Sequence, residues 1–213
     1  MDNSQGLAEA HDPEFRGEEK RGATRFISLI RSAKLIGSQG EFICVIRDVS
    51  ATGISLRTFH KLPADDGLRL ELQNGETYRL TRTRAEEREA SYRFAQPVEV
   101  DRLIRESWNF PKRQLRLNLA IPLAFSCLTG NGTGTSINLS QQGAKVECDM
   151  DFAIDQAVRV TSRRFGETRA KVRWRDGQTY GLVFDNTLSL RELALLAAAV
   201  QCPALLHDTP IEG

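Results

Sequence analysis

Two short polar motifs near the start of the chain combine residue types that bind phosphates and purine bases. Arg21-Gly-Ala-Thr-Arg25 has the form R-x-x-x-R, and Asp48-Val-Ser50-Ala-Thr-Gly53 has the form D-x-S-x-x-G. An arginine guanidinium grips a phosphate with two hydrogen bonds, donates to guanine O6 and N7, and stacks on a base. A carboxylate accepts from the guanine N1–H and N2–H₂ edge, a serine hydroxyl donates or accepts, and glycine allows close backbone approach. The residue types of the two motifs are therefore compatible with a site for an anionic ligand.

A second set of the same residue types follows about 90 positions later. It consists of Lys112, Arg113 and Arg116, followed by Asn138, Ser140 and Gly143. The last arginine precedes the acid or amide by 23 positions in the first set and by 22 in the second. The same order at nearly the same spacing indicates two copies of one small domain. Lysine at the first position of the second set cannot reproduce the fork or the stacking of arginine, so the first copy is the expected ligand site.

Each motif alone has a plainer interpretation. The first arginine pair lies beside Glu18 and Glu19, which fits a solvated charge cluster, and D-x-S-x-x-G is a common turn. The glycine-rich Thr129–Gly134 lacks the G-K-[ST] ending of a phosphate loop, so a loose hairpin turn is expected there. The basic residues Arg169, Lys171 and Arg173 fit either a nucleic-acid contact or, more simply, the solvent-exposed face of a strand. The pairing and the repetition of the motifs are what favour a binding site.

The elements around both sets are short strands with period-two alternation. In the first half, Leu68, Leu70 and Leu72 alternate with polar residues, and Asn74-Gly75 predicts a hairpin. The stretch TRTRAEEREASYRF, residues 81–94, contains neither Trp nor Gly, and irregular last strands are expected there. Many short strands at this spacing predict an antiparallel barrel or sandwich.

The second half repeats the pattern and adds one helix. Ala170, Val172 and Trp174 are expected on one face of a strand, and Asp176-Gly177 predicts a hairpin into TYGLVF. Ser189 and Glu192 form a capping box ahead of an Ala/Leu-rich run, which predicts a C-terminal helix.

Composition excludes several functional classes. The 213 residues carry 29 Lys plus Arg against 28 Asp plus Glu, so bulk positive charge for DNA or RNA is absent. No apolar run reaches the length of a membrane helix, and no secretory signal is visible, which predicts a cytoplasmic protein. Cys44 and Cys127 lie in apolar runs and are expected to be buried thiols. The remaining Cys and the three His residues form neither a metal site nor a nucleophile–base pair, so no enzyme is predicted.

The paired motifs, in this order and twice over, resemble the PilZ domain, and residues 20–190 resemble a tandem PilZ protein. The resemblance implies a mainly β chain of two antiparallel six-stranded PilZ-like β-barrels that bind cyclic di-GMP, a bacterial second messenger, with no other cofactor. The expected organisation is a flexible tail over 1–20, one barrel over 21–100 and a linker over 101–111. A second barrel over 112–188 follows, and then a helix and tail over 189–213.

Under this resemblance the chain is a non-catalytic receptor that senses cyclic di-GMP and relays it to a protein partner. The ligand residues expected in the first barrel are Arg21, Arg25, Asp48, Ser50 and Gly53. Partners of such proteins govern motility, exopolysaccharide synthesis or attachment, and the sequence does not identify the partner or the oligomeric state. The rival hypothesis is a ligand-independent adaptor whose PilZ-like sites have decayed.

Overall fold

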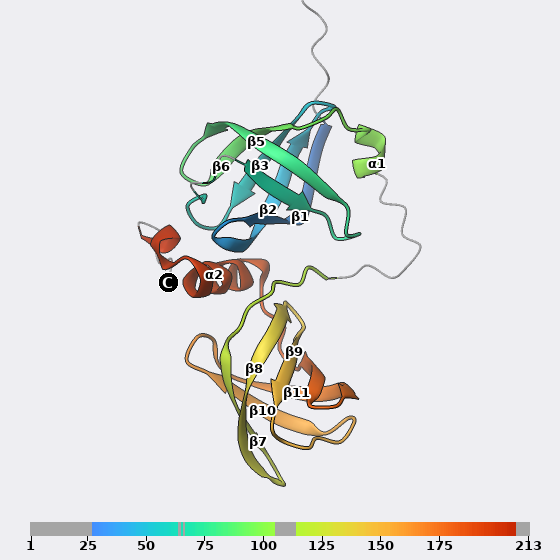
Figure 1. The fold of residues 1–213 in the computed structure, drawn as a ribbon, viewed down its shortest axis with the longest axis vertical. Helices are drawn as coiled ribbons and strands as arrows, with labels where there is room; N and C mark the ends of the chain where they lie inside the picture. Colours follow the sequence, from blue (N-terminus) through green and yellow to red (C-terminus); the bar gives the residue numbers. More distant parts are fainter. Residues whose placement is uncertain (1–26, 64, 66, 105–113, 208–213) are drawn as a thin grey trace, which may run out of the picture.

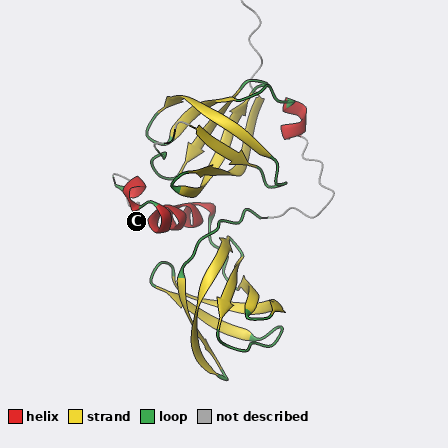
Figure 2. Ribbon diagram, in the orientation of Figure 1, coloured by secondary structure: helices red, strands yellow, loops and turns green. Residues whose placement is uncertain are grey.

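The structure of the protein, a computed structural model, describes residues 27–63, 65, 67–104 and 114–207. These residues form two closed antiparallel barrels of six strands each, one above the other in Figure 1, with one helix between them. The prediction of two six-stranded barrels with a C-terminal helix is confirmed. Figure 2 shows that strands dominate both units.

The first barrel is closed by strands in the order β1-β2-β3-β6-β5-β4. Its elements are β1 (Ile27–Gly37), β2 (Gly40–Val49), β3 (Gly53–Thr58), β4 (Gly67–Glu71), β5 (Thr77–Ala85), β6 (Glu89–Phe94) and the short helix α1 (Val100–Ile104). The irregularity expected in the last strands is a single register shift between Arg82 and Arg84, and β5 and β6 pair on both sides of it. A buried Tyr92 supplies the aromatic core side chain there, so the barrel closes without tryptophan.

The second barrel repeats this order as β7-β8-β9-β12-β11-β10. Its elements are β7 (Pro122–Cys127), β8 (Gly130–Ser140), β9 (Gly143–Cys148), β10 (Ala157–Ser162), β11 (Gly166–Asp176), β12 (Thr179–Phe184), the helix α2 (Leu190–Gln201) and a 3₁₀ turn (Pro203–Leu206). The repeat extends into the loops, since Val98 N donates to Ala51 O and Leu188 N donates to Gln141 O, both at 2.8 Å.

Three details of the second barrel correct the sequence expectations. The glycine-rich segment is not a loose turn: apart from Thr129 it is the start of β8, where Gly134 faces the backbone of Glu147 too closely for a Cβ. Trp174 does not share a face with Val172, because a register shift between them turns the indole to the outside. Cys127 is partly exposed at a strand end, whereas Cys44 is buried as expected.

Helix α2 joins the two barrels. The predicted capping box is present, with Glu192 N donating to Ser189 Oγ at 3.1 Å and Ser189 N donating to a Glu192 carboxylate oxygen at 2.7 Å. Leu193 and Ala197 pack into the core of the second barrel, whereas Ala198 packs into the core of the first. Ile43 of β2 belongs to the second core, so both faces of β2 are buried at this point. The two barrels therefore share helix α2 as a packing element.

Among the described residues, no helix combines the length and the apolar character needed to cross a bilayer.

Candidate functional site

The two motifs of the second barrel meet in the structure. Arg116 lies on the segment leading into the barrel, and Asn138 lies on β8 beside the register shift that follows Ser136. The Arg116 guanidinium donates to Asn138 Oδ1 at 3.1 Å, although 22 residues separate the two in sequence. Both side chains remain at least partly exposed. A cationic fork and an amide thus lie together at the barrel surface.

Strand register extends this pair into a row of residues across the outside of the barrel. Asn138 is paired with Lys145 on β9, Lys145 with Gly181 on β12, and Gly181 with Trp174 on β11. Cross-strand partners lie on the same face of a sheet, so these four residues form one line, here called the second-barrel row. Lys145 Nζ lies 6.0 Å from the centroid of the Trp174 ring, and the indole is 41% exposed.

Sequence reasoning missed Lys145 and Trp174 as site residues. Neither belongs to a motif, and both join the site only through strand pairing. The sequence signal for them was the offset of 90 positions between the two copies. Together with the strand register, this offset places Lys145 and Trp174 at the same positions as Ser55 and Arg84 of the first copy.

The serine and glycine of each motif shape the turn between two strands. Ser50 is 1% exposed, and its hydroxyl donates to Gly53 O at 3.2 Å and accepts from Gly53 N at 3.0 Å. Ser140 is 3% exposed, and its hydroxyl donates to Gly143 O at 3.1 Å. A Cβ on Gly143 would lie 2.0 Å from Leu182 O, so β9 and β12 approach each other only because this residue is glycine.

The same positions of the first barrel carry different chemistry. The equivalent line, here called the first-barrel row, contains Asp48, Ser55, Ser91 and Arg84 in that order. It lies in a recess of about 200 Å³ that is also lined by Glu86 and Glu89. Arg84 is paired with Glu86 at 2.7 Å. This row has Ser55 where the second-barrel row has Lys145, and Arg84 where that row has Trp174.

Four predicted site residues lie outside the described residues. They are Arg21, Arg25, Lys112 and Arg113.

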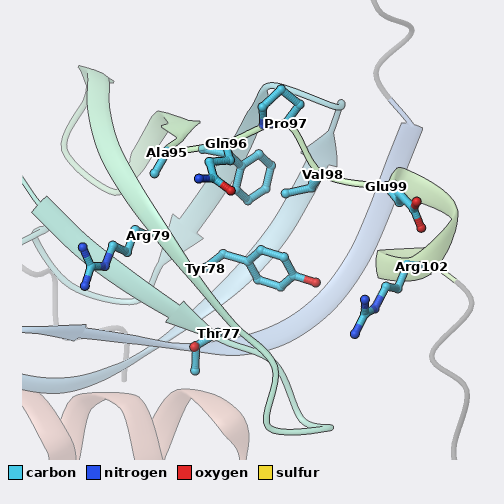
Figure 3. Close-up of a pocket in the computed structure, with 10 residues that line it drawn as sticks. Thr77, Tyr78, Arg79, Ala95, Gln96, Pro97, Val98, Glu99 and Arg102 are labelled. Atoms are coloured by element: carbon cyan, nitrogen blue, oxygen red, sulfur yellow. The ribbon is translucent and has the colours of Figure 1, made fainter.

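A larger pocket of about 580 Å³ lies elsewhere on the first barrel (Figure 3). Tyr78, Val98 and Arg102 line it, and no residue of either motif does so. Glu76 accepts from the Tyr78 hydroxyl at 2.8 Å and from Arg102 Nη2 at 2.6 Å. Burial, assisted by the bond to Glu76, raises the pKa of Tyr78 to about 12. The Tyr78 hydroxyl and the Arg102 guanidinium are therefore both already hydrogen-bonded to the Glu76 carboxylate at this end of the pocket.

The part of the chain that the structure describes contains no group of three or more His, Cys, Asp or Glu side chains able to hold a metal ion.

Comparisons with known proteins agree with the geometry of the second barrel. The family model of the PilZ domain matches residues 111–201. No curated protein is detectably similar in sequence.

Several solved structures are similar to this chain at low sequence identity. The crystal structure of the Borreliella burgdorferi PlzA protein in complex with c-di-GMP is 11% identical, with 85% of this chain and 94% of that chain covered and a TM-score of 0.33. The Bacillus subtilis inhibitor of motility, MotI, is 15% identical, with 84% and 98% covered and a TM-score of 0.35. Escherichia coli YcgR, solved in complex with c-di-GMP, is 12% identical, with 76% and 80% covered and a TM-score of 0.29.

The matched range contains β7 to β12 and α2, and the first barrel has the same strand order and the same loop hydrogen bonds. Residues 111–201 are therefore a PilZ domain, and the chain pairs it with a second barrel of the same topology.

Proposed function

We propose that this protein is a non-catalytic bacterial receptor for cyclic di-GMP and that the second barrel holds the ligand. The observation that carries the proposal is the hydrogen bond from Arg116 to Asn138, which brings both motifs of the PilZ domain together at the end of the second-barrel row.

The chemistry of this row suits a cyclic guanine dinucleotide. The Arg116 guanidinium offers several N–H donors to phosphate oxygens or to guanine O6 and N7. The Asn138 amide oxygen accepts from a guanine N–H edge, and its amide nitrogen donates. Lys145 adds a positive charge beside the exposed indole of Trp174, whose face can stack on a base. The phosphates thus have Arg116 and Lys145 as partners, the guanine edge has Asn138, and the plane of the base has Trp174.

The geometry favours the second barrel, whereas the comparison of motifs in the sequence favoured the first. The second-barrel row holds Lys145 with no carboxylate among its four residues, and Arg116 contacts its end. The recess around the first-barrel row is lined by Asp48, Glu86 and Glu89 together with two arginines. Those carboxylates oppose a doubly charged anion, because like charges at short range repel. We therefore assign Arg21 and Arg25 of the first copy a secondary role in ligand binding.

Relay to a protein partner completes the proposed function. Because α2 packs into both cores, a change at the second barrel reaches the first through a shared element. The rival is a ligand-independent adaptor built on the same two barrels.

Calorimetric titration of cyclic di-GMP into the full chain separates these functions. Wild type should bind, and Arg116→Ala should bind about ten- to hundredfold more weakly, because hydrogen bonds from a charged group are worth about 1.5–3 kcal/mol. Arg25→Ala is the matched variant in the first copy and should have a smaller effect. A larger loss in Arg25→Ala would move the site to the first barrel. Absence of binding by wild type at high micromolar ligand would leave the adaptor function.

A further inference from the structure

A buried lysine of the first barrel contacts the backbone of Arg116. Lys34 lies on β1 and is 5% exposed. Its ammonium forms ion pairs with Glu41 at 3.3 Å and Glu71 at 3.0 Å, both from the first barrel. It also donates to the carbonyl oxygen of Arg116 at 3.3 Å. A charged group of one barrel thus holds the main chain of the residue whose side chain reaches Asn138 in the other.

Glu41 holds the same segment two residues further on. One of its carboxylate oxygens accepts from the Asn118 backbone N–H at 2.8 Å, and the other accepts from the Asn118 side-chain amide at 2.8 Å. The backbone of Glu41 is itself fixed by Gln201 of α2, whose amide accepts from Glu41 N and donates to Glu41 O. Its carboxylate therefore projects from an anchored position.

The segment between these contacts is fixed to the second barrel on its other side. Leu117 is buried and exchanges two backbone hydrogen bonds of 2.9 Å with Leu139, the residue after Asn138. Residues 116–118 are therefore held between the first barrel and β8. The direction of the Arg116 side chain depends on both.

We propose that Lys34 and Glu41 are positioning residues for the ligand site of the second barrel. They hold the backbone at Arg116 and Asn118, so that the guanidinium stays directed at Asn138 and at the ligand. The first barrel then completes a site that it does not itself line. This inference rests on the proposed function of that site.

The opposing interpretation is that the same contacts only fasten the barrels together. Two glutamates allow the interpretations to be separated. Each forms an ion pair with Lys34, but among the described residues the hydrogen bonds to the 116–118 segment come from Glu41 and not from Glu71. In Glu41→Ala, Lys34 keeps Glu71 as its partner; in Glu71→Ala, it keeps Glu41. Neither variant leaves the buried lysine without a counter-charge.

The test compares the two variants by calorimetric titration with cyclic di-GMP and by NMR-detected amide exchange without ligand. Glu41→Ala should weaken binding about three- to thirtyfold, the usual range for residues that act on a site from outside it. Glu71→Ala should stay within about twofold of wild type. The Asn118 amide should exchange faster in Glu41→Ala only. Thermal unfolding of both variants checks that the barrels remain folded.

Each outcome has one meaning. Equal affinity loss in both variants, or none in Glu41→Ala, overturns the positioning role. Unchanged exchange at Asn118 in Glu41→Ala overturns the contact on which it depends. Failure of wild type to bind cyclic di-GMP overturns the proposed function instead, because wild type has both Glu41 and Glu71 in place.

Discussion

The indole of Trp174 lies against the backbone of Gly181. The two residues are cross-strand partners on β11 and β12, and a Cβ on Gly181 would come within 2.0 Å of the indole Nε1. One ring face is thereby set on the barrel, while 41% of the residue remains exposed. An aromatic ring that lies against the barrel and is still partly exposed is suited to stacking on a base.

Gly181→Ala should therefore push the indole off the barrel and weaken cyclic di-GMP binding. The methyl group meets a side chain that can swing outward, so the fold should survive with a loss of about 1 kcal/mol of stability. Tryptophan fluorescence, recorded in a Trp108→Phe background, should shift to longer wavelength. Trp174→Phe, which keeps a smaller ring, is the control and should retain more affinity than Trp174→Ala. Equal affinities for these two variants would argue against stacking.

The glycines of the two motifs should respond differently to the same substitution. A Cβ on Gly143 would lie 2.0 Å from Leu182 O, whereas a Cβ on Gly53 would lie 3.3 Å from Tyr92 O. Gly143→Ala must separate β9 from β12 and should lower the free energy of unfolding by about 3 kcal/mol or more. Gly53→Ala should lower it by less than about 1.5 kcal/mol. Urea unfolding of both variants measures the difference, and equal losses would contradict the unequal approach of the strands.

The motif serine should matter more for folding than for binding. Ser140 is buried, and its hydroxyl donates to Gly143 O within the turn. Ser140→Ala should lower the free energy of unfolding by about 1 kcal/mol, the usual net value of one such hydrogen bond. Its affinity for cyclic di-GMP should stay within about twofold of wild type. A tenfold affinity loss with unchanged stability would instead show that the hydroxyl contacts the ligand.

His60 should make the stability of the protein pH-dependent. Burial lowers its pKa below the usual value, an effect only partly offset by the hydrogen bond that Nδ1 donates to Lys61 O at 2.6 Å. Among the described residues, its Nε2 is buried without a partner. The folded state therefore resists a proton that the unfolded state accepts below about pH 6.5. The contribution of neutral His60 to the free energy of unfolding is fully present above that pH. It is lost as the pH falls toward the lower pKa of the folded state.

Urea unfolding between pH 8 and pH 5.5 tests this effect. The free energy of unfolding should decline by at most about 1.4 kcal/mol per pH unit below pH 6.5. His60→Leu should abolish this slope, and exposed His207→Gln should keep it. The same slope in His60→Leu and wild type would assign the effect to other groups.

The sequence predicted the fold well because the fold depends on local signals. Alternation gave the strands, Asp176-Gly177 gave a hairpin, and Ser189 with Glu192 gave the start of α2. The face of Trp174 was mispredicted because a register shift inserts one residue, and one residue reverses every side chain beyond it.

The site was harder to predict because it depends on which strands are neighbours. Lys145 and Trp174 are 29 positions apart and lie in one row only because β9 and β11 both flank β12. The contact of Lys34 with the backbone of Arg116 spans 82 positions and two barrels, and no spacing rule contains it.

Replacing Lys145 by the residue at the same position of the first-barrel row tests the role of its charge. Lys145 in the second-barrel row corresponds to Ser55 in the first-barrel row. Lys145→Ser should weaken cyclic di-GMP binding by about three- to tenfold and should reduce the dependence of affinity on salt, because one partly exposed positive charge beside the proposed ligand position is lost. Calorimetric titration at about 50 and 300 mM salt measures both effects.

Arg84→Ala is the matched control, since Arg84 holds the Trp174 position in the first-barrel row and is paired with Glu86. It should leave affinity and salt dependence unchanged if the ligand occupies the second barrel. A loss in Arg84→Ala together with a normal Lys145→Ser protein would transfer the site to the first-barrel recess, where Arg84 would have to exchange its partner Glu86 for a phosphate. That exchange would give up an existing ion pair of 2.7 Å, whereas Lys145 of the second-barrel row forms no ion pair among the described residues, which supports the proposal that the second barrel holds the ligand.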